Sequence, residues 1–287
     1  MFNLHTEILN NPGFFKQMAS RETMITFYDC PLKNKFEELW SEHSYIAYVT
    51  EGRKVWHTSQ GSFDLHKGDC VLIRKGACIV EQFFDTKFCL IFFFVPDKFI
   101  CDVLKSKSRP LPNVNKNYHA VISIDTNDAV HNFFNSMLTY FSSNREPDTT
   151  LLDLKFRELI LTIADNPLNT ELISYFCDLV KKPKTFSLQR VMEENYCFNL
   201  KLEGFASLCA RSLSSFKRDF QNIYKTTPAK WLLEKRLMHA YNLIVNSGKT
   251  VAEASYESGF ENISHFSNAF RKRFGAAPAS LKQQSAV

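Results

Sequence analysis

Residues 205–231 read FASLCARSLSSFKRDFQNIYKTTPAKW, and residues 251–281 read VAEASYESGFENISHFSNAFRKRFGAAPASL. Each stretch holds a short helical pattern, a turn, and a second helical pattern with two Phe residues four positions apart. Three positions recur after 50 residues: Ser212 as Asn262, Phe216 as Phe266, and Phe220 as Phe270. A supersecondary unit that recurs at a fixed offset is a fold-level signal. We therefore expect two tandem helix-turn-helix units in the last third of the chain.

The second helix of each unit is predicted to carry an exposed face suited to DNA. Ser212 and Asn262 can cap these helices, and the Phe residues four positions apart point inward. The outward-facing residues are then Ser214, Lys217, Arg218 and Gln221 in the first unit, and Ile263, Ser264, Ser267 and Asn268 in the second. Polar side chains on one exposed helix face can reach base edges and phosphates. Arg271-Lys272-Arg273 ends the second helix, and we expect one or two of these charges to reach phosphate.

A long helix is predicted between the two units. Thr227 can cap it, Pro228 suits its first position, and it should run to about Asn246. A rigid connector would fix the distance between two recognition helices, and neighbouring major-groove turns are about 34 Å apart. The remaining helices expected here are Phe186–Asn195 with Ser187 as its cap, Leu200–Cys209 and Thr250–Glu257. Gly259 stands where the second turn should need a positive φ.

Length and charge indicate two domains. The 287 residues suffice for two cores. Residues 181–287 hold 17 Lys and Arg against 8 Asp and Glu, a net charge of +9, whereas residues 1–180 hold 18 against 22, a net charge of −4. The sign changes at Lys181-Lys182-Pro183-Lys184, which is the predicted linker. We expect a sensor or dimerisation domain at 1–180 and a DNA-binding domain at 181–287, whose basic charge suits phosphate.

The first domain is predicted to be rich in strands and then helical. Short runs with Gly-containing turns suggest a small sandwich or barrel, with strands at Ser44–Thr50, Arg53–Ser59, Cys70–Arg74 and Lys87–Val95. Apolar residues at three- and four-residue steps then indicate helices at Asn127–Phe141, Leu151–Ala164 and Asn169–Val180. These helices either cover one face of the barrel or pair with another subunit. The whole chain is therefore of the α+β class.

The cysteines and the hydropathy pattern indicate a reducing compartment. Cys30, Cys70, Cys78, Cys89, Cys101, Cys177, Cys197 and Cys209 form no CxxC pair and no Cys/His ligand spacing. Most of them lie within apolar runs, which is typical of buried, reduced thiols. No leader-like segment opens the chain and no run reaches membrane-spanning length. We expect a cytoplasmic protein without a membrane span.

Enzyme, cofactor and metal chemistry are not predicted. No Ser/His/Asp pattern, paired acid motif or phosphate-binding Gly loop is present. His43, His57 and His66 are scattered, without an HxH pair and a following Glu, so we expect no metal site and no cofactor. An apolar effector pocket is a candidate, because Phe92 and Phe94 share one strand face while Phe93 points to the other. Packed core is the competing interpretation. Candidate ligand contacts are Tyr45, Trp56, Arg74, Phe92 and Phe94.

Residues 186–283 resemble the DNA-binding domain of the AraC/XylS family of bacterial transcription regulators. The resemblance rests on the two quoted stretches and on EKRLMHAYNLI between them. It implies two helix-turn-helix units that enter successive major grooves, with RNA polymerase as a partner. By position, it assigns base-facing roles to Ser214, Lys217 and Arg218 in the first unit and to Ile263, Ser264, Ser267 and Asn268 in the second. The N-terminal half resembles the cupin-like sensor domains of the family, through KGDCVLIRKG and the order of strands before helices.

Two positions depart from the family pattern. Ala210 stands where many relatives have Gly, at a cost of about 1 kcal/mol if its φ is positive. Asn268 stands where many have Arg, and Asn favours adenine when it reaches a base edge. The resemblance implies a transcription regulator, more often an activator than a repressor, with an N-terminal domain that binds a small effector, forms a homodimer or engages a regulatory protein. The alternative is a protein-interaction module with weak or vestigial DNA binding.

Overall fold

The structure is a computed structural model that describes residues 1–29, 34–84, 88–112, 114, 117–142, 146–181 and 188–284. The chain divides into two compact units, Phe2–Thr185 and Phe186–Val287, called the N-terminal and C-terminal units below. The predicted linker, after Lys181, lies outside the described residues. So do Phe186 and Ser187, which were expected to open the first C-terminal helix.

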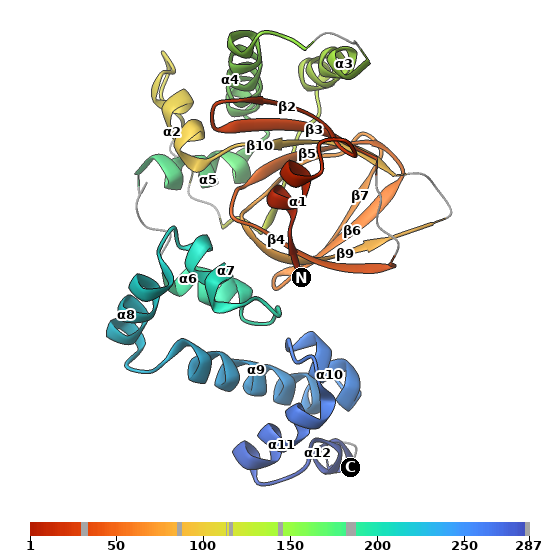
Figure 1. The fold of residues 1–287 in the computed structure, drawn as a ribbon, viewed down its shortest axis with the longest axis vertical. Coiled ribbons are helices and arrows are strands. Elements are labelled where there is room, and N and C mark those ends of the chain that lie inside the picture. Colours follow the sequence, from red (N-terminus) through yellow and green to blue (C-terminus); the bar gives the residue numbers. More distant parts are fainter. Residues whose placement is uncertain are drawn as a thin grey trace. The chain divides into compact units, whose positions relative to one another are not determined.

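Two sheets face each other in the N-terminal unit (Figure 1). One has five strands in the order β1 (Phe2–Asn3), β4 (Phe36–Ser41), β9 (Gly76–Gln82), β6 (Arg53–Thr58) and β7 (Gly61–His66). The other has six, in the order β11 (Val121–Ile124), β8 (Cys70–Ile73), β5 (Tyr45–Glu51), β10 (Cys89–Phe94), β3 (Thr23–Asp29) and β2 (Lys16–Ser20). Neighbouring strands are antiparallel, except that β1 pairs with β4 in parallel. The predicted α+β class is confirmed, and its strand-rich part is a sandwich.

Strand β10 separates the two cores of this unit. Phe92 and Phe94 are buried between the sheets, as the alternation of side chains predicts. Phe93 points to the other side, where its ring lies 5.5 Å from Phe134 and 5.4 Å from Phe156. Those two rings belong to helices α3 (Asp128–Ser142) and α4 (Thr149–Asp165). The helical stripes therefore bury their apolar faces against their own sheet, where each buried Phe contributes about 1.5–3 kcal/mol.

Three further helices complete the N-terminal unit. They are α1 (Leu4–Asn10), α2 (Asp97–Lys105) and α5 (Thr170–Lys181). Leu4 and Ile8 of α1 join the core between the sheets. The sequence pattern did not reveal α1 or α2. Both are short, and α1 depends on the strands it packs against for its stability.

The C-terminal unit is all-helical. Its helices are α6 (Leu188–Asn195), α7 (Leu202–Leu208), α8 (Leu213–Tyr224), α9 (Pro228–Val245), α10 (Val251–Glu257), α11 (Ile263–Phe274) and α12 (Pro278–Gln284). The long helix α9 packs against both helix-turn-helix units (Figure 1). At its start, Trp231 lies 6.0 Å from the ring of Phe220. Towards its end, Leu237 and Ile244 share a core with Phe266. The predicted connector is confirmed.

Buried thiols are found in both units, as expected. Within the described residues, Cys70, Cys78, Cys89, Cys101, Cys177 and Cys209 are free and buried, and Cys197 is free and half-buried. Burial raises the pKa of Cys78 to about 12, so this thiol stays protonated and unreactive at neutral pH. No helix in the described part of the chain combines the length and the apolar character needed to cross a membrane.

Candidate nucleic-acid interface

The two turns that precede α8 and α11 have the same geometry. In the first, the Arg211 amide donates to the Ala206 carbonyl over 3.0 Å, and Ala210 has a φ of +52°. In the second, the Phe260 amide donates to the Ser255 carbonyl over 3.1 Å, and Gly259 has a φ of +82°. Each bond runs from the amide of the sixth residue to the carbonyl of the first, as in a Schellman motif, and the residue before the donor is left-handed. The positive φ of Gly259 was predicted from the sequence, and that of Ala210 shows that the repeat extends to the geometry of the turns.

Ala210 stores strain that its counterpart Gly259 avoids. A non-Gly residue in the left-handed region costs about 1–2 kcal/mol, partly offset by the lower chain entropy of Ala in the unfolded state. We expect Ala210→Gly to raise the free energy of unfolding of the C-terminal unit by about 0.5–1 kcal/mol. Hydrogen exchange of the α7 and α8 amides in the full chain measures this.

A matched substitution is expected to lower the free energy of unfolding instead. Ala229 lies in the first turn of α9 with an exposed side chain, so Ala229→Gly should cost up to about 1 kcal/mol. If Ala210→Gly destabilises the unit as Ala229→Gly does, the strain at Ala210 is absent.

Caps define both recognition helices at the predicted residues. The Ser212 hydroxyl accepts from the Ser215 amide at 3.3 Å. The Asn262 carboxamide oxygen accepts from two amides, those of Ser264 at 2.8 Å and His265 at 3.0 Å. Each helix is 12 residues long and ends at a left-handed residue, Lys225 or Gly275. Asn262 satisfies two of the four free N–H groups at its helix start, which fixes where α11 begins.

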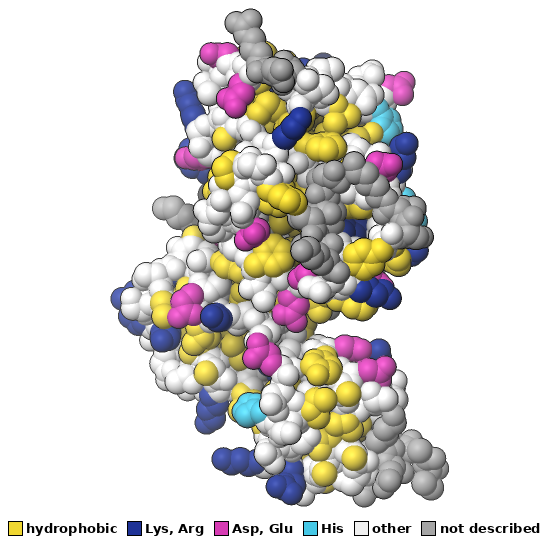
Figure 2. Space-filling model, turned by 45° about the vertical axis from the view of Figure 1, so that its right-hand side comes forward, with side chains coloured by type: hydrophobic (Ala, Val, Ile, Leu, Met, Phe, Trp, Pro, Cys, Tyr) yellow, Lys and Arg dark blue, Asp and Glu magenta, His cyan; other side chains and the backbone are white. Residues whose placement is uncertain are grey.

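The predicted faces of α8 and α11 are exposed. Phe216, Phe220, Phe266 and Phe270 are fully buried. On the opposite side, the exposed residues are Ser212, Ser214, Lys217, Arg218, Gln221, Asn262, Ile263, Ser264, Asn268, Arg271 and Lys272, while Ser267 is half-buried. Figure 2 shows Lys and Arg side chains along the lower left margin of the space-filling view, on the C-terminal unit. Their roles as DNA contacts stay a prediction.

Ion pairs divide these cations into two groups. Arg218 lies 3.4 Å from Asp219, which also pairs with Arg211 at 3.0 Å. Arg273 pairs with Glu234 at 2.6 Å. Lys217, Arg271 and Lys272 have no carboxylate partner among the residues that the structure describes. Exposed pairs such as Arg218–Asp219 contribute about 0–1 kcal/mol, so Arg218 can leave Asp219 for a phosphate or a base.

Arg236 is a supporting residue that the sequence reasoning missed. It lies on α9, and its guanidinium donates to the backbone carbonyls of Tyr196 at 2.7 Å and Phe198 at 2.6 Å. An added Cβ on Gly259 would lie 3.2 Å from the Arg236 Nε. One side chain therefore contacts the loop before the first helix-turn-helix unit and the turn of the second. No pattern in the sequence indicated this role of Arg236, because an Arg on a polar helix face is ordinarily interpreted as a solvent-exposed side chain.

A cleft of about 540 Å³ separates the two helix-turn-helix units. Lys201 and Leu202 of the first unit, Leu233 and Arg236 of α9, and Asn262 of the second unit are among its lining residues. Asn199 donates to Glu261 across it. The two helix-turn-helix units are thus held together by α9 and a few polar contacts, and each helix-turn-helix unit keeps its own apolar core.

The candidate effector residues separate into two places in the N-terminal unit. Tyr45, Trp56, Phe92 and Phe94 pack together between the sheets, with the Tyr45 ring 5.2 Å from Phe92. Burial raises the pKa of Tyr45 well above its usual value, so its hydroxyl is neutral. Arg74 is not in this core: its guanidinium lies 5.1 Å from the Tyr118 ring and 5.7 Å from Tyr175 on α5. A ligand role for either place stays a prediction.

Comparisons with known proteins match both units. The family model described as the ExsA N-terminal regulatory domain matches residues 44–175, and the one described as a helix-turn-helix domain matches residues 205–284. The chain is 26% identical to the virulence regulon transcriptional activator VirF of Yersinia enterocolitica serotype O:8, over 92% of this chain and 97% of VirF. It is 32% identical to the HTH-type transcriptional regulator ExsA of Pseudomonas aeruginosa, over 45% of this chain and 46% of ExsA.

Among solved structures, the chain is similar to that of an apo ToxT variant from Vibrio cholerae, with a TM-score of 0.43 and 13% identity over 92% of this chain and 97% of ToxT. A regulatory domain followed by two helix-turn-helix units defines a transcription regulator. These matches confirm the resemblance to the AraC family of transcription regulators that is seen in the sequence.

Proposed function

We propose that this protein is a sequence-specific DNA-binding activator of transcription, controlled through its N-terminal unit by a small effector or a protein partner. The observation that carries the proposal is the pair of identically built turns, each followed by a capped helix with an exposed outer face. The match of residues 44–175 to a regulatory domain supports control through the N-terminal unit. The names of VirF and ExsA support a role in transcription, and that of VirF supports activation.

Helices α8 and α11 would enter neighbouring major grooves. The 18-residue connector α9 is about 27 Å long at 1.5 Å per residue, comparable with the ~34 Å between groove turns. Ser212, Ser214, Lys217, Arg218 and Gln221 would contact one groove, and Asn262, Ile263, Ser264, Ser267 and Asn268 the next. Arg favours guanine and Asn favours adenine. Arg271 and Lys272 lie in the last turn of α11, have no carboxylate partner in the described part of the chain, and would contact phosphate.

Selection from random duplexes tests DNA recognition by the full chain. We expect an enriched site with two conserved blocks about 10 base pairs apart, and affinity that falls steeply as salt is raised. On that site, Arg218→Ala should weaken binding by about 1–3 kcal/mol, or about 5- to 150-fold, if Arg218 contacts a base. Fluorescence anisotropy at about 0.15 M salt measures both affinities.

Lys249→Ala is the matched control for lost charge. Lys249 pairs with Glu257 at 2.8 Å and lies before α10, outside both recognition helices. Lys249→Ala should weaken DNA binding far less than Arg218→Ala does. Equal effects of the two substitutions would remove Arg218 from the interface. No sequence preference over competitor DNA would favour the alternative, a protein-interaction module with vestigial DNA binding.

The proposal includes two further partners. Activation requires contact with RNA polymerase, as the family resemblance implies. A homodimer is supported by exposed Leu151 and Leu154 at the start of α4, 39% and 58% accessible, which an interface would cover. Sedimentation at micromolar concentration tests the dimer, and a monomer would exclude it.

A protein that regulates a bacterial chromosome acts in the cytoplasm.

A further inference from the structure

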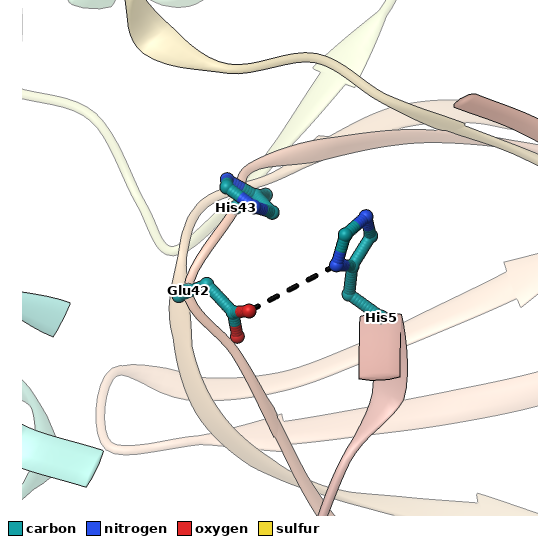
Figure 3. A group of neighbouring side chains, drawn as sticks. All are labelled: His5, Glu42 and His43. Carbon is teal, nitrogen blue, oxygen red and sulfur yellow. Dashed lines mark ion pairs between the residues drawn. The ribbon is translucent and has the colours of Figure 1, made fainter. Parts of the chain in front are cut away.

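Two imidazoles and a carboxylate converge at one end of the N-terminal unit (Figure 3). His5 lies on α1, whereas Glu42 and His43 follow β4 in the turn that leads to β5. All three side chains are half-buried, and their ligand atoms lie within 4.8 Å of one another. The rings of His5 and His43 are 4.6 Å apart and nearly perpendicular, at 81°. No other such group of His, Cys, Asp and Glu occurs in the described residues.

We propose that His5, Glu42 and His43 bind a divalent transition-metal ion of the Zn²⁺ type, with water completing its coordination. Imidazole nitrogen and carboxylate oxygen are ligands of Zn²⁺ at about 2.0–2.2 Å, which places neighbouring ligand atoms of a tetrahedral site about 3.3 Å apart. The three side chains reach that geometry if each moves inward by about 1 Å.

An ordinary salt bridge does not account for this group. Glu42 Oε1 lies 3.8 Å from His5 Nδ1, at the edge of ion-pair distance. The imidazole lone pairs of His5 and His43 are what a metal ion requires.

Surrounding residues hold the ligands in place. The Asn3 side-chain amide donates to the second oxygen of Glu42, and the Asn3 oxygen caps α1 by accepting from the Thr6 amide at 2.9 Å. β1 pairs with β4 through Phe2 and Asn3. The His5 ring lies 5.0 Å from the buried Phe94. Such outer contacts orient metal ligands in proteins. A bound ion would join α1 and β1 to the turn between the two sheets.

The sequence hid this group because its members lie far apart in the chain. His43, His57 and His66 are scattered in the sequence. In the structure, His57 contacts Ser62 and Glu81, and His66 contacts Asp64, so neither of them joins His43. The partner of His43 is His5, 38 positions earlier. Only the packing of α1 beside the end of β4 brings them together.

Titration of the chelator-treated full chain with Co²⁺ tests the site. We expect one Co²⁺ per chain, visible as d–d absorption and displaced by Zn²⁺, and a higher melting temperature with Zn²⁺. Glu42→Gln and His43→Asn should each weaken binding at least about 10-fold. Gln can still accept from Asn3, so Glu42→Gln keeps the fold, which circular dichroism checks.

His66→Asn is the matched control, because His66 also faces a carboxylate, 3.3 Å from Asp64, but has no third ligand among the residues described. It should bind Co²⁺ as the wild type does. The proposal is overturned if the wild type takes up no stoichiometric Co²⁺, if Glu42→Gln and His43→Asn bind as tightly as the wild type, or if His66→Asn weakens binding equally. These outcomes do not depend on DNA binding.

Discussion

Gly259→Ala is expected to destabilise the C-terminal unit by about 2–5 kcal/mol. The methyl group would lie 2.7 Å from the Cys197 carbonyl oxygen, closer than nonbonded atoms approach. The φ of +82° adds about 1–2 kcal/mol for any residue with a Cβ. Relief of the contact requires the backbone to move, which costs about 1–3 kcal/mol in a packed site.

Gly248 separates these two causes. Its φ is +65°, but nothing lies within 4 Å of an added Cβ. Gly248→Ala should therefore cost only the conformational part, about 1–2 kcal/mol. Native-state hydrogen exchange of the α10 and α11 amides measures both variants in the full chain. If the two substitutions cost the same, the approach of Cys197 to Gly259 is not as close as the structure has it.

Arg236→Met is the second substitution with a large expected effect, about 2–4 kcal/mol. Met retains much of the apolar packing of the Arg stem, but it leaves the Tyr196 and Phe198 carbonyls without their donor. A fully buried acceptor that loses a charged donor costs about 1–3 kcal/mol, and the half-buried Tyr196 should contribute less than the buried Phe198. Because Arg236 also lies beside Gly259, we expect reduced protection of amides in both helix-turn-helix units.

The neighbouring Lys235 provides a control on the same helix. Lys235 pairs with Glu193 at 2.7 Å, and both side chains are substantially exposed, at 39% and 48%. Lys235→Met should cost about 0–1 kcal/mol, because exposed ion pairs contribute little. Thermal unfolding of the full chain, together with hydrogen exchange, compares the two variants. An Arg236→Met protein as stable as Lys235→Met would show that Arg236 is merely a surface cation.

The helix ends of the DNA-binding unit could be predicted because their causes are local. Ser212, Thr227, Thr250 and Asn262 each accept from an amide two or three residues onward. Gly259 takes the positive φ that was predicted for it. Phe spacing assigned the buried faces of α8 and α11, where Phe216, Phe220, Phe266 and Phe270 are fully buried.

The N-terminal sheets were predicted less completely. Strands were expected only within residues 44–95, whereas β2, β3 and β4 precede them and β11 follows. β4, with the sequence FEELWS, has an irregular burial pattern because β1 covers its edge in parallel. Such pairing between distant segments leaves no periodic signal in either one.

The sequence by itself determined where the recognition helices begin, which of their faces is buried and that the second turn needs a left-handed residue. These features depend on contacts within about four residues, so adjacent side chains suffice to specify them. Only the tertiary structure decided that Arg236 bonds the Tyr196 and Phe198 carbonyls, that Arg74 lies apart from Tyr45 and Trp56, and that His5 meets Glu42 and His43. Each of these depends on packing between segments far apart in the chain, and no local pattern records it.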